Sequence, residues 1–383
     1  MKRLHDQSVS LQHQKKLCLT SMVATILTTM CLTLSGNVIA ADNTTTLNIK
    51  HATDSIATKS TTPHSTSPLS TAYASTTSPI NPNQLYRHRI TPEERAPYAN
   101  YFWRYDSKDN GEYPDRFRMI TNDARLNPKL SGIFTTGLDT LRISGSSQPT
   151  VQQFKHMAKE IKSKTDGPVF DVDLRQETHL FVNDYPISRY AKRDWINVGK
   201  VSEEILTTEE ELVKTLPGQS LSIHRLTKEK TAGTGMTITV TSVATEASVA
   251  HKAGFNYWRL TATDHIWPDA TIVDQFISLY RNLPTNAWLH FHCEAGKGRT
   301  TTFMALYDMM RNPHVPLYDI LKRQEALGGI SLMATGNEKG WKAPYSKQRS
   351  DMLALFHQYV TETTYTNYAT PWSTWLNRHN ENK

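Results

Sequence analysis

The sequence predicts an α/β protein in which a central sheet is flanked by helices. Short apolar segments, typical of buried strands, alternate with longer segments whose apolar residues recur at helical spacing. Two segments between residues 220 and 243 instead alternate polar and apolar residues, which predicts antiparallel strands of a smaller β-rich part. With 383 residues, the chain is long enough to bury a large hydrophobic core.

The expected elements follow from these periodicities. Strands are expected at residues 141–143, 168–174, 220–226, 236–243, 255–260 and 287–292. Helices are expected at residues 151–161, 202–216, 244–253, 271–283 and 300–310, and two or three more close the chain. Ser202 is a candidate N-cap of its helix. We therefore expect one folded domain over residues 86–383, with a β-rich insertion at about 175–245.

The first 40 residues have the pattern of a secretory signal peptide. A basic stretch that ends at Lys15 and Lys16 precedes an apolar segment over residues 17–34, and a signal-peptidase site follows at Ala40. The apolar segment is also nearly long enough for an uncleaved membrane anchor. Cleavage after Ala40 is the favoured interpretation. It predicts export to the periplasm or the extracellular space, without stable membrane insertion afterwards.

The exported chain would keep a single cysteine and a mild positive charge. Cys18 and Cys31 lie in the expected signal peptide, so only Cys293 would remain, as a candidate reactive thiol. The first 40 residues also carry +3 of the net charge of +7. The remaining +4 suits an anionic substrate and is too weak to indicate nucleic acid. Residues 41–85 are rich in Thr, Ser, Asn and Pro, which predicts a disordered linker.

One loop carries the clearest chemical signal. The segment His292-Cys293-Glu294-Ala295-Gly296-Lys297-Gly298-Arg299-Thr300 follows an expected strand and precedes an expected helix. Gly296 and Gly298 permit a tight turn and close approach of the backbone. The backbone N–H groups of such a loop, together with the N-terminus of the helix, attract anions. The segment therefore predicts a phosphate-binding loop.

Cys293 is the candidate nucleophile of this loop. The positive potential would lower the pKa of its thiol and favour the thiolate. Arg299 can hold two phosphate oxygens at once with its planar guanidinium. In-line attack by the thiolate on a bound phosphate would give a phosphocysteine intermediate. The alternative is a buried cysteine that precedes an arginine by chance.

A phosphate ester also needs a proton for its departing oxygen, which a carboxylic acid can supply. The loop over residues 262–269 follows an expected strand and offers Asp264 and Asp269. Asp269 lies just before the helix expected at 271–283 and therefore fits an N-cap. Asp264 has no such structural explanation and is favoured as the acid. The same carboxylate could later deprotonate the water that hydrolyses the intermediate.

These motifs resemble a known family. The loop over residues 292–300 is similar to the signature of the protein-tyrosine-phosphatase superfamily. The wider sequence resembles the bacterial cysteine phytases, tyrosine-phosphatase-like enzymes that dephosphorylate myo-inositol hexakisphosphate. The matching segments are residues 173–179, 193–195, 263–265, 288–296, 328–329, 341–342 and 370–376. The resemblance covers about residues 86–379 and implies a tyrosine-phosphatase-like central sheet.

The resemblance implies roles for individual residues. Cys293 would be the nucleophile, Arg299 the phosphate clamp and Asp264 the general acid. The implied substrate-binding residues are Arg118, Asp194, His265, Glu294, Ala295, Gly296, Lys297, Gly298, Thr300, Lys342 and Arg349. Asp194 would lie at the pocket rim, whereas Lys342 and Arg349 would contact peripheral phosphates. For these three and Arg118, the alternative is an ordinary surface or ion-paired charge. Either Lys228 or Lys230 could add a contact.

Two positions depart from the family pattern. Lys297 replaces a small apolar residue, and the inositol-lipid 3-phosphatase tumour suppressor has the same Gly-Lys-Gly-Arg run. A cation in the loop would favour substrates with several phosphates, unless Lys297 simply points into solvent. Ser346 stands where the family tends to carry an aromatic residue.

The sequence therefore predicts an exported phosphatase that acts stepwise on inositol polyphosphates such as phytate. No metal or other cofactor is expected, because His290 and His292 are expected to serve the loop. The expected partner is a small anionic substrate, and the oligomeric state stays open. A phosphotyrosine or phosphoinositide phosphatase is the alternative within enzymes. A non-catalytic inositol-phosphate binder is the alternative outside them, and the thiol of Cys293 together with an acid argues against it.

Overall fold

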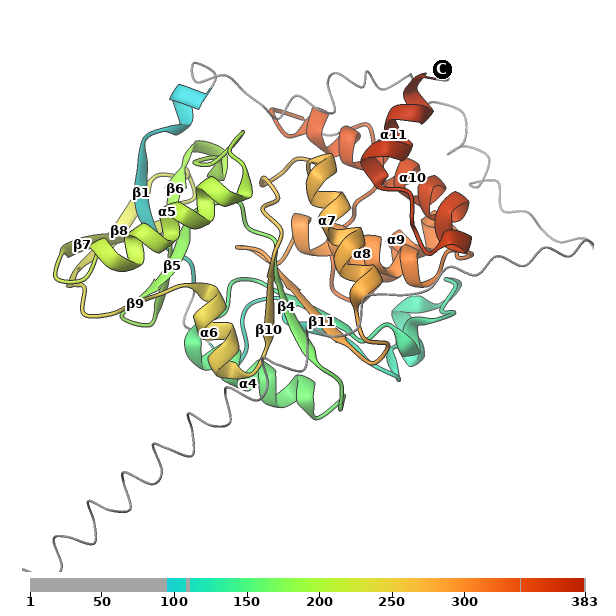
Figure 1. The fold of residues 1–383 in the computed structure, drawn as a ribbon, viewed down its shortest axis with the longest axis horizontal. Coiled ribbons are helices and arrows are strands. Elements are labelled where there is room, and N and C mark those ends of the chain that lie inside the picture. The colour runs from blue at the N-terminus through green and yellow to red at the C-terminus, as the bar shows by residue number, and fades with distance from the viewer. Residues whose placement is uncertain (1–94, 108–110, 338, 382–383) are drawn as a thin grey trace, which may run out of the picture. The chain divides into compact units, whose positions relative to one another are not determined.

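Two β-sheets form the framework of the computed structural model, which describes residues 95–107, 111–337 and 339–381 (Figure 1). The expected signal peptide (1–40) and linker (41–85) lie outside the described residues. No helix in the described part of the chain is both long and apolar enough to cross a membrane.

The central sheet has five strands. Their order is β10 (Asn256–Arg259), β4 (Val169–Asp173), β11 (Trp288–His292), β3 (Ile143–Ser146) and β2 (Arg118–Ile120). All neighbours are parallel except β2, which lies antiparallel at one edge. His292 pairs with both Asp173 and Ser146, so the strands end in register. The loops that follow β3, β4, β10 and β11 therefore leave the same edge of the sheet, where ligands bind in open α/β sheets.

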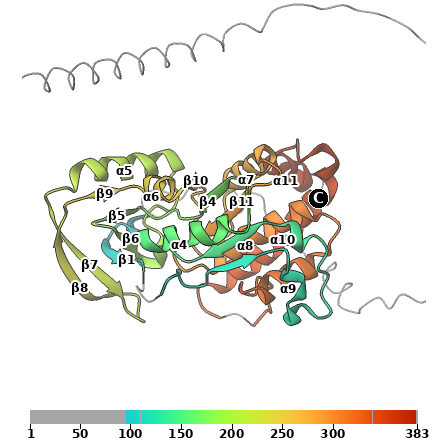
Figure 2. The ribbon, with the colours of Figure 1, turned by 90° about the horizontal axis from the view of Figure 1, so that it is seen from below.

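Helices cover both faces of the central sheet (Figures 1 and 2). One face packs against α4 (Val151–Lys162) and α6 (Glu246–Ala253), with Phe154 and Trp288 in the shared core. The other face packs against the remaining helices of this part: α7 (Ala270–Asn282), α8 (Gly298–Arg311), α9 (Leu317–Ala326), α10 (Ala343–Thr363) and α11 (Trp372–Glu381). Because side chains alternate along a strand, Leu289 and Phe291 face this second core. The α/β prediction is confirmed.

The second sheet has six strands and is covered by α5 (Ser202–Thr215). Its order is β8 (Ala232–Thr239), β7 (Ser220–Leu226), β1 (Tyr101–Tyr105), β6 (Tyr185–Ala191), β5 (His179–Val182) and β9 (Val243–Ala244). Leu212 and Leu216 pack against strand residues such as Ile187 and Ile223. Strand β1 comes from outside the 175–245 range, so the sheet is not built from that insertion alone.

Several predicted elements differ from the observed ones. Strands β1, β2, β5, β6 and β9 were not predicted, and β3 and β8 are shifted by several residues. The structure also shows that Ser202 is the first helical residue rather than the N-cap, which is Val201. The Ser202 hydroxyl instead bonds to that of Thr261, at 2.7 Å. Short 3₁₀ turns complete the chain: η1 (Ala96–Tyr98), η2 (Ala124–Leu126), η3 (Pro128–Leu130), η4 (Leu138–Thr140), η5 (Lys192–Asp194) and η6 (Thr364–Thr366).

Candidate active site

The phosphate-binding loop predicted from the sequence lies between β11 and α8, at the edge of the sheet where four loops meet. Cys293 is only 2% exposed, and the hydroxyl of Thr300 donates a hydrogen bond of 3.2 Å to its sulfur. Gly296 has φ = 66°, and a Cβ there would lie 2.5 Å from the backbone nitrogen of Ser147. Only glycine fits this close approach of the loop to the end of β3.

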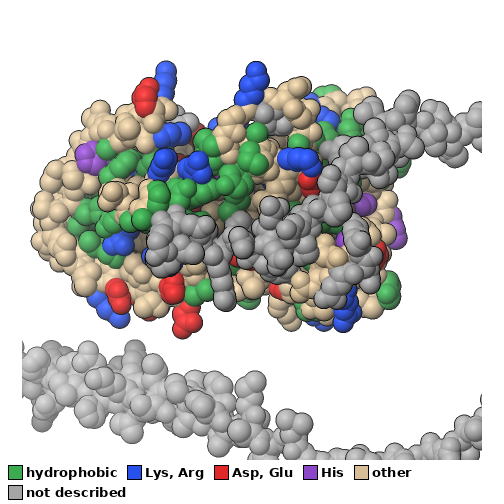
Figure 3. Space-filling model, turned by 90° about the horizontal axis from the view of Figure 1, so that it is seen from above, with side chains coloured by type: hydrophobic (Ala, Val, Ile, Leu, Met, Phe, Trp, Pro, Cys, Tyr) green, Lys and Arg blue, Asp and Glu red, His purple; other side chains and the backbone are tan. Residues whose placement is uncertain are grey.

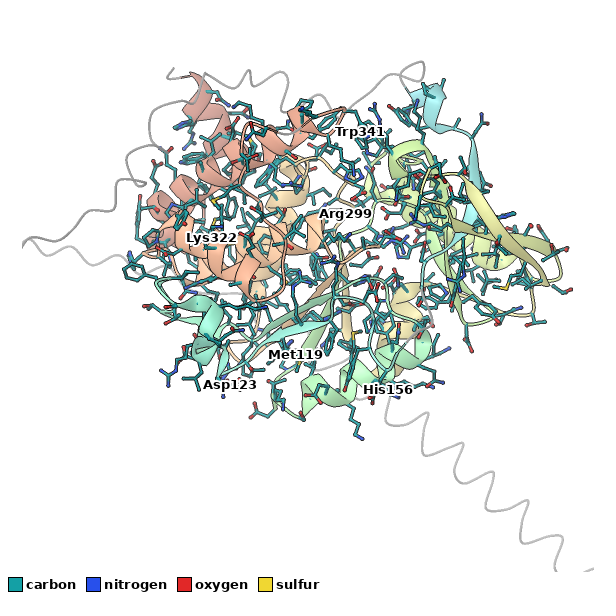
Figure 4. The ribbon with its side chains drawn as sticks, turned by 180° about the vertical axis from the view of Figure 1, so that it is seen from behind. Met119, Asp123, His156, Arg299, Lys322 and Trp341 are labelled. Carbon is teal, nitrogen blue, oxygen red and sulfur yellow. The ribbon has the colours of Figure 1, made fainter. Side chains whose placement is uncertain are left out.

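Arg299 is held rigidly beside this loop, near the middle of the molecule (Figure 4). Its Nη1 and Nη2 donate to the two carboxylate oxygens of Glu177, at 2.7 and 2.9 Å. Nη1 also donates to the carbonyl of Ala262, at 3.2 Å. Burial would raise the pKa of Glu177, but the guanidinium groups of Arg299 and Arg175 lower it far below the ordinary value. Glu177 therefore stays ionised, and its two hydrogen bonds fix the orientation of the Arg299 guanidinium.

Glu177 was not among the site residues predicted from the sequence, although it lies within the matching segment at residues 173–179. It is part of a buried chain of charges. Arg175 joins Glu177 to Asp106, at 3.1 and 3.0 Å, and Arg104 in turn contacts Asp106 at 2.6 Å. Asp106 and Arg104 belong to no motif, so no signal in the sequence could have placed them here.

Asp194 ends this chain of charges and does not lie at the pocket rim, as the resemblance had implied. Its carboxylate is 3.0 Å from Arg104 Nη1, and the residue is only 5% exposed. Burial raises the pKa of Asp194 to about 8, despite the opposing charge of Arg104. The inward position is explained by the pairing with Arg104, which is itself only 2% exposed, and the backbone at Arg193 and Asp194 has φ = 64° and 66°.

Asp264 contacts a different nitrogen of Arg299 from the two that Glu177 holds. Its Oδ1 is 3.2 Å from Arg299 Nε, and its Oδ2 is 3.0 Å from Nε2 of His265. Burial would raise the pKa of Asp264, but the charge of Arg299 and the hydrogen bond from His265 outweigh this and lower it to about 2. The Asp264 side chain keeps 22% exposure, so it is accessible from the loop side. The structure brings Cys293, Arg299 and Asp264 together as the sequence predicted.

Asp269 has the structural role that its position predicted. It is the N-cap of α7, and its side chain accepts a hydrogen bond of 3.0 Å from the backbone of Ala270.

Arg118 supports the loop from behind. It lies on β2 and donates to the carbonyl of Gly296, at 3.1 Å, and to the hydroxyl of Thr301, at 3.4 Å. Burial lowers the pKa of Arg118 to about 10. The neighbouring cavity is lined by Arg116 rather than Arg118, and Arg116 was not predicted as a site residue.

Four cations surround the loop on its open side. The pKa of Lys342 is lowered by burial and by the charges of Lys230, Lys297 and Arg349. The carboxylate of Asp264 acts in the opposite direction but does not outweigh them. Exposed Lys297 and Lys230 line a cavity of about 560 Å³ that borders the loop at Glu294 and Ala295. Arg349 borders a smaller hollow beside Gly298 and Arg299. Of the two lysines left open by the sequence, Lys230 lines the cavity. Figure 3 shows several Lys and Arg side chains around an apolar strip on one face of the molecule.

A second buried group of charges lies behind the loop. His292 Nε2 is 2.7 Å from Glu246, and His179 Nε2 is 2.9 Å from the same carboxylate. Burial lowers the pKa of each imidazole, but the nearby carboxylates outweigh this and raise it to about 10 for His292 and about 9 for His179. With Asp171 and Asp173, these residues form the two sets in the described chain that lie close enough to hold a metal ion. The sequence had indicated no metal site.

Comparisons with known proteins agree with this geometry. Residues 172–311 match the family model of PTP-like phytases, described as "Inositol hexakisphosphate". The chain is 34% identical to the PTP-like phytase from Bdellovibrio bacteriovorus, over 73% of this chain and 96% of that one, with a TM-score of 0.59. It is 41% identical to the tandemly repeated PTP-like phytase from Mitsuokella multacida, over 73% of this chain and 49% of that one, with a TM-score of 0.67. The same values apply to the Mitsuokella phosphatase in complex with myo-inositol-(1,3,4,5)-tetrakisphosphate.

A further relative is the effector protein HopD2 of Pseudomonas syringae pv. tomato. It is 30% identical over 255 residues, which are 64% of this chain and 53% of the effector. The chain thus spans about half the length of the Pseudomonas and Mitsuokella proteins.

Proposed function

The chain belongs to the family of PTP-like phytases, and from that premise we propose that it hydrolyses phosphate monoesters of myo-inositol polyphosphates through a phosphocysteine intermediate. One observation carries the proposal. A buried thiol, a rigidly held guanidinium and a partly exposed carboxylate meet at one loop, with Arg299 Nε 3.2 Å from Asp264 and Thr300 bonded to Cys293.

The first step is attack by the Cys293 thiolate on a phosphorus bound above it. A bond forms between Sγ and phosphorus as the bond from phosphorus to the inositol oxygen breaks. Among the described residues, Arg299 Nε makes only the ion-pair contact with Asp264 at 3.2 Å and no hydrogen bond, and Nη2 makes one hydrogen bond. An arginine has five N–H donors, so this edge of the guanidinium can bind phosphate oxygens while Glu177 holds the other hydrogens.

The departing inositol oxygen takes its proton from Asp264. In the free protein this carboxyl has a pKa of about 2 and is therefore ionised at neutral pH. A phosphate monoester has a second pKa of about 6, so its monoanion can bring the proton that Asp264 lacks. We therefore predict that kcat/KM for phytate falls as the pH rises above about 6, measured as phosphate release across a pH series.

The second half of the reaction regenerates the thiolate. Asp264, ionised after the first step, accepts a proton from a water molecule that attacks the phosphocysteine. The bond from sulfur to phosphorus breaks, inorganic phosphate leaves, and Asp264 gives the proton up to the departing phosphate or to solvent, which restores its ionised form.

The cations around the loop support a substrate with several phosphates. Lys230, Lys297 and Arg349 each act electrostatically on Lys342. Only one phosphate can occupy the loop at Cys293. These cations would meet phosphates elsewhere on the same inositol ring. The Mitsuokella structure with a bound inositol tetrakisphosphate is in line with this substrate class.

The test is phosphate release by the purified chain, with and without a chelator. Phytate, a phosphotyrosine peptide and an inositol lipid are offered side by side, with Cys293→Ser as the control. Release mainly from phytate, and none from the variant, is the expected result. A preference for the peptide or the lipid would instead indicate a phosphotyrosine phosphatase or a phosphoinositide phosphatase. Equal activity of wild type and Cys293→Ser would reject the mechanism.

We also propose that the chain is exported after cleavage at Ala40. The basic and apolar segments at residues 1–40 support this, as does the single cysteine left afterwards. Mass spectrometry of the protein from periplasm and medium should find an N-terminus at Ala41. A cytoplasmic protein that retains residues 1–40 would contradict it.

A further inference from the structure

The acid loop, residues 262–269 with the proposed general acid Asp264, receives a hydrogen bond from a tryptophan outside the central sheet. Trp195 follows η5, at the end of β6 in the second sheet, and its Nε1 donates a hydrogen bond of 2.9 Å to the backbone carbonyl of Asp264. Trp195 is 6% exposed, so water competes little for this bond. The bond joins two segments that lie 69 residues apart in sequence.

A cluster of rings fixes this indole. The ring of Trp195 meets Trp341 edge-on at 5.9 Å and Tyr345 at 5.8 Å. The guanidinium of Arg193 lies over both indoles, 5.1 Å from Trp195 and 4.4 Å from Trp341. His265 packs against Trp341 at 5.0 Å. Figure 4 shows Trp341 above Arg299.

The backbone at both ends of this contact is strained. His265, next to Asp264, has φ = 70°, and Arg193, next but one to Trp195, has φ = 64°. Residues other than glycine keep such conformations only where their surroundings hold them. The ring cluster is the surrounding structure that holds both.

The hydrogen bond from Trp195 holds the backbone carbonyl of Asp264 in place. This limits the positions of the carboxyl group of the same residue, because its side chain has only two rotatable torsions. We propose that Trp195 is a positioning residue, which aims the carboxyl of Asp264 at the leaving oxygen of the substrate. This inference rests on the proposed function. It differs from a purely structural role for Trp195, in which the cluster only joins the second sheet to the rest of the fold.

The experiment uses the dependence of proton donation on the leaving group. An inositol oxygen needs a proton to depart, whereas the phenolate of p-nitrophenyl phosphate departs without one. Trp195→Phe keeps a ring in the cluster and removes the N–H donor. The matched control is Trp258→Phe, at an exposed indole on β10. Both variants are assayed on phytate and p-nitrophenyl phosphate, at a temperature where both are folded.

We expect Trp195→Phe to lower kcat/KM on phytate about tenfold, a part of the hundredfold or more that a general acid contributes. Its kcat/KM on p-nitrophenyl phosphate should stay within about twofold, as should both values for Trp258→Phe. The comparison uses kcat/KM because this constant covers only the steps up to the phosphocysteine, so the later role of Asp264 as a base does not enter. In an Asp264→Asn background, Trp195→Phe should have no further effect on phytate, because the group it positions is gone.

Equal losses on both substrates, or an undiminished loss in the Asp264→Asn background, would overturn the inference and leave only a structural role. Failure of the proposed function gives a different result. In that case, wild type would not release phosphate from phytate, or Cys293→Ser would still do so.

Discussion

The buried ion pair between Glu177 and Arg299 can be tested for its effect on both stability and catalysis. Glu177→Gln keeps the size of the side chain and removes its charge. The carboxylate accepts three hydrogen bonds, from Arg299 at 2.7 and 2.9 Å and from Arg175 at 3.1 Å, and is fully buried. A glutamine has one acceptor oxygen, and its N–H₂ group would face a guanidinium that also only donates.

Glu177→Gln is expected to affect both the stability of the protein and the rate of the reaction. Removal of one partner of a buried ion pair costs about 3–5 kcal/mol of stability, because the other charge stays buried without compensation. Arg299 would also lose the bond that fixes its orientation. Misplacement of such a group by about 1 Å lowers the rate on the order of 100-fold. We therefore expect Glu177→Gln to lose both stability in urea unfolding and kcat on phytate.

Glu209→Gln is the matched control. Glu209 is a buried carboxylate that also accepts three hydrogen bonds, two from Arg259 at 2.9 and 3.2 Å and one from the backbone of His179 at 2.9 Å. It lies in α5, and its hydrogen bonds in the described part of the chain go to Arg259 and His179. The control should lose similar stability and keep kcat within about threefold. If the two variants kept the same kcat, the argument that Glu177 orients Arg299 would be refuted.

Three further predictions concern the surrounding structure. The raised pKa of His292, about 10, means that its charge stabilises the fold fully below pH 6.5, and this contribution is lost as the pH rises toward 10, so stability in urea unfolding should fall over that range. Asp269→Ala should cost about 1 kcal/mol in the same assay through loss of the N-cap, with kcat unchanged. Lys297→Val should raise KM for phytate about two- to fivefold at low salt and less at high salt, with kcat unchanged.

The elements predicted well are those whose signal is local. The apolar stripes of α7 and α8 and the apolar run of β11 each specify an element without reference to the rest of the chain. The missed strands lack such a signal. Strand β6 contains Pro186, Ser188 and Arg189, which argue against a central strand. The strand forms because β1 and β5 pair with it on both sides, and such pairing cannot be seen in one sequence.

The same distinction applies to the site. The motif around Cys293 is contiguous, so the sequence could place the nucleophile and the guanidinium. Glu177 and Arg299 are 122 residues apart and meet only because β4 and β11 are neighbours whose ends are in register. The rim position expected for Asp194 was wrong because its carboxylate pairs with Arg104, 90 residues away in the sequence, and this contact also depends on the tertiary fold.

Arg299 contacts two carboxylates, and their different exposure suits different roles. Glu177 is fully buried and holds the guanidinium on one edge, whereas Asp264 keeps 22% exposure and approaches only Nε, at 3.2 Å. A bound phosphate would compete with Asp264 for that Nε, which weakens the interaction that keeps the pKa of this carboxyl low. Substrate binding would then favour the protonated form of Asp264 at the moment when a proton donor is needed. This coupling requires that the arginine stay in place while Asp264 changes its charge, and the buried bond to Glu177 provides that stability.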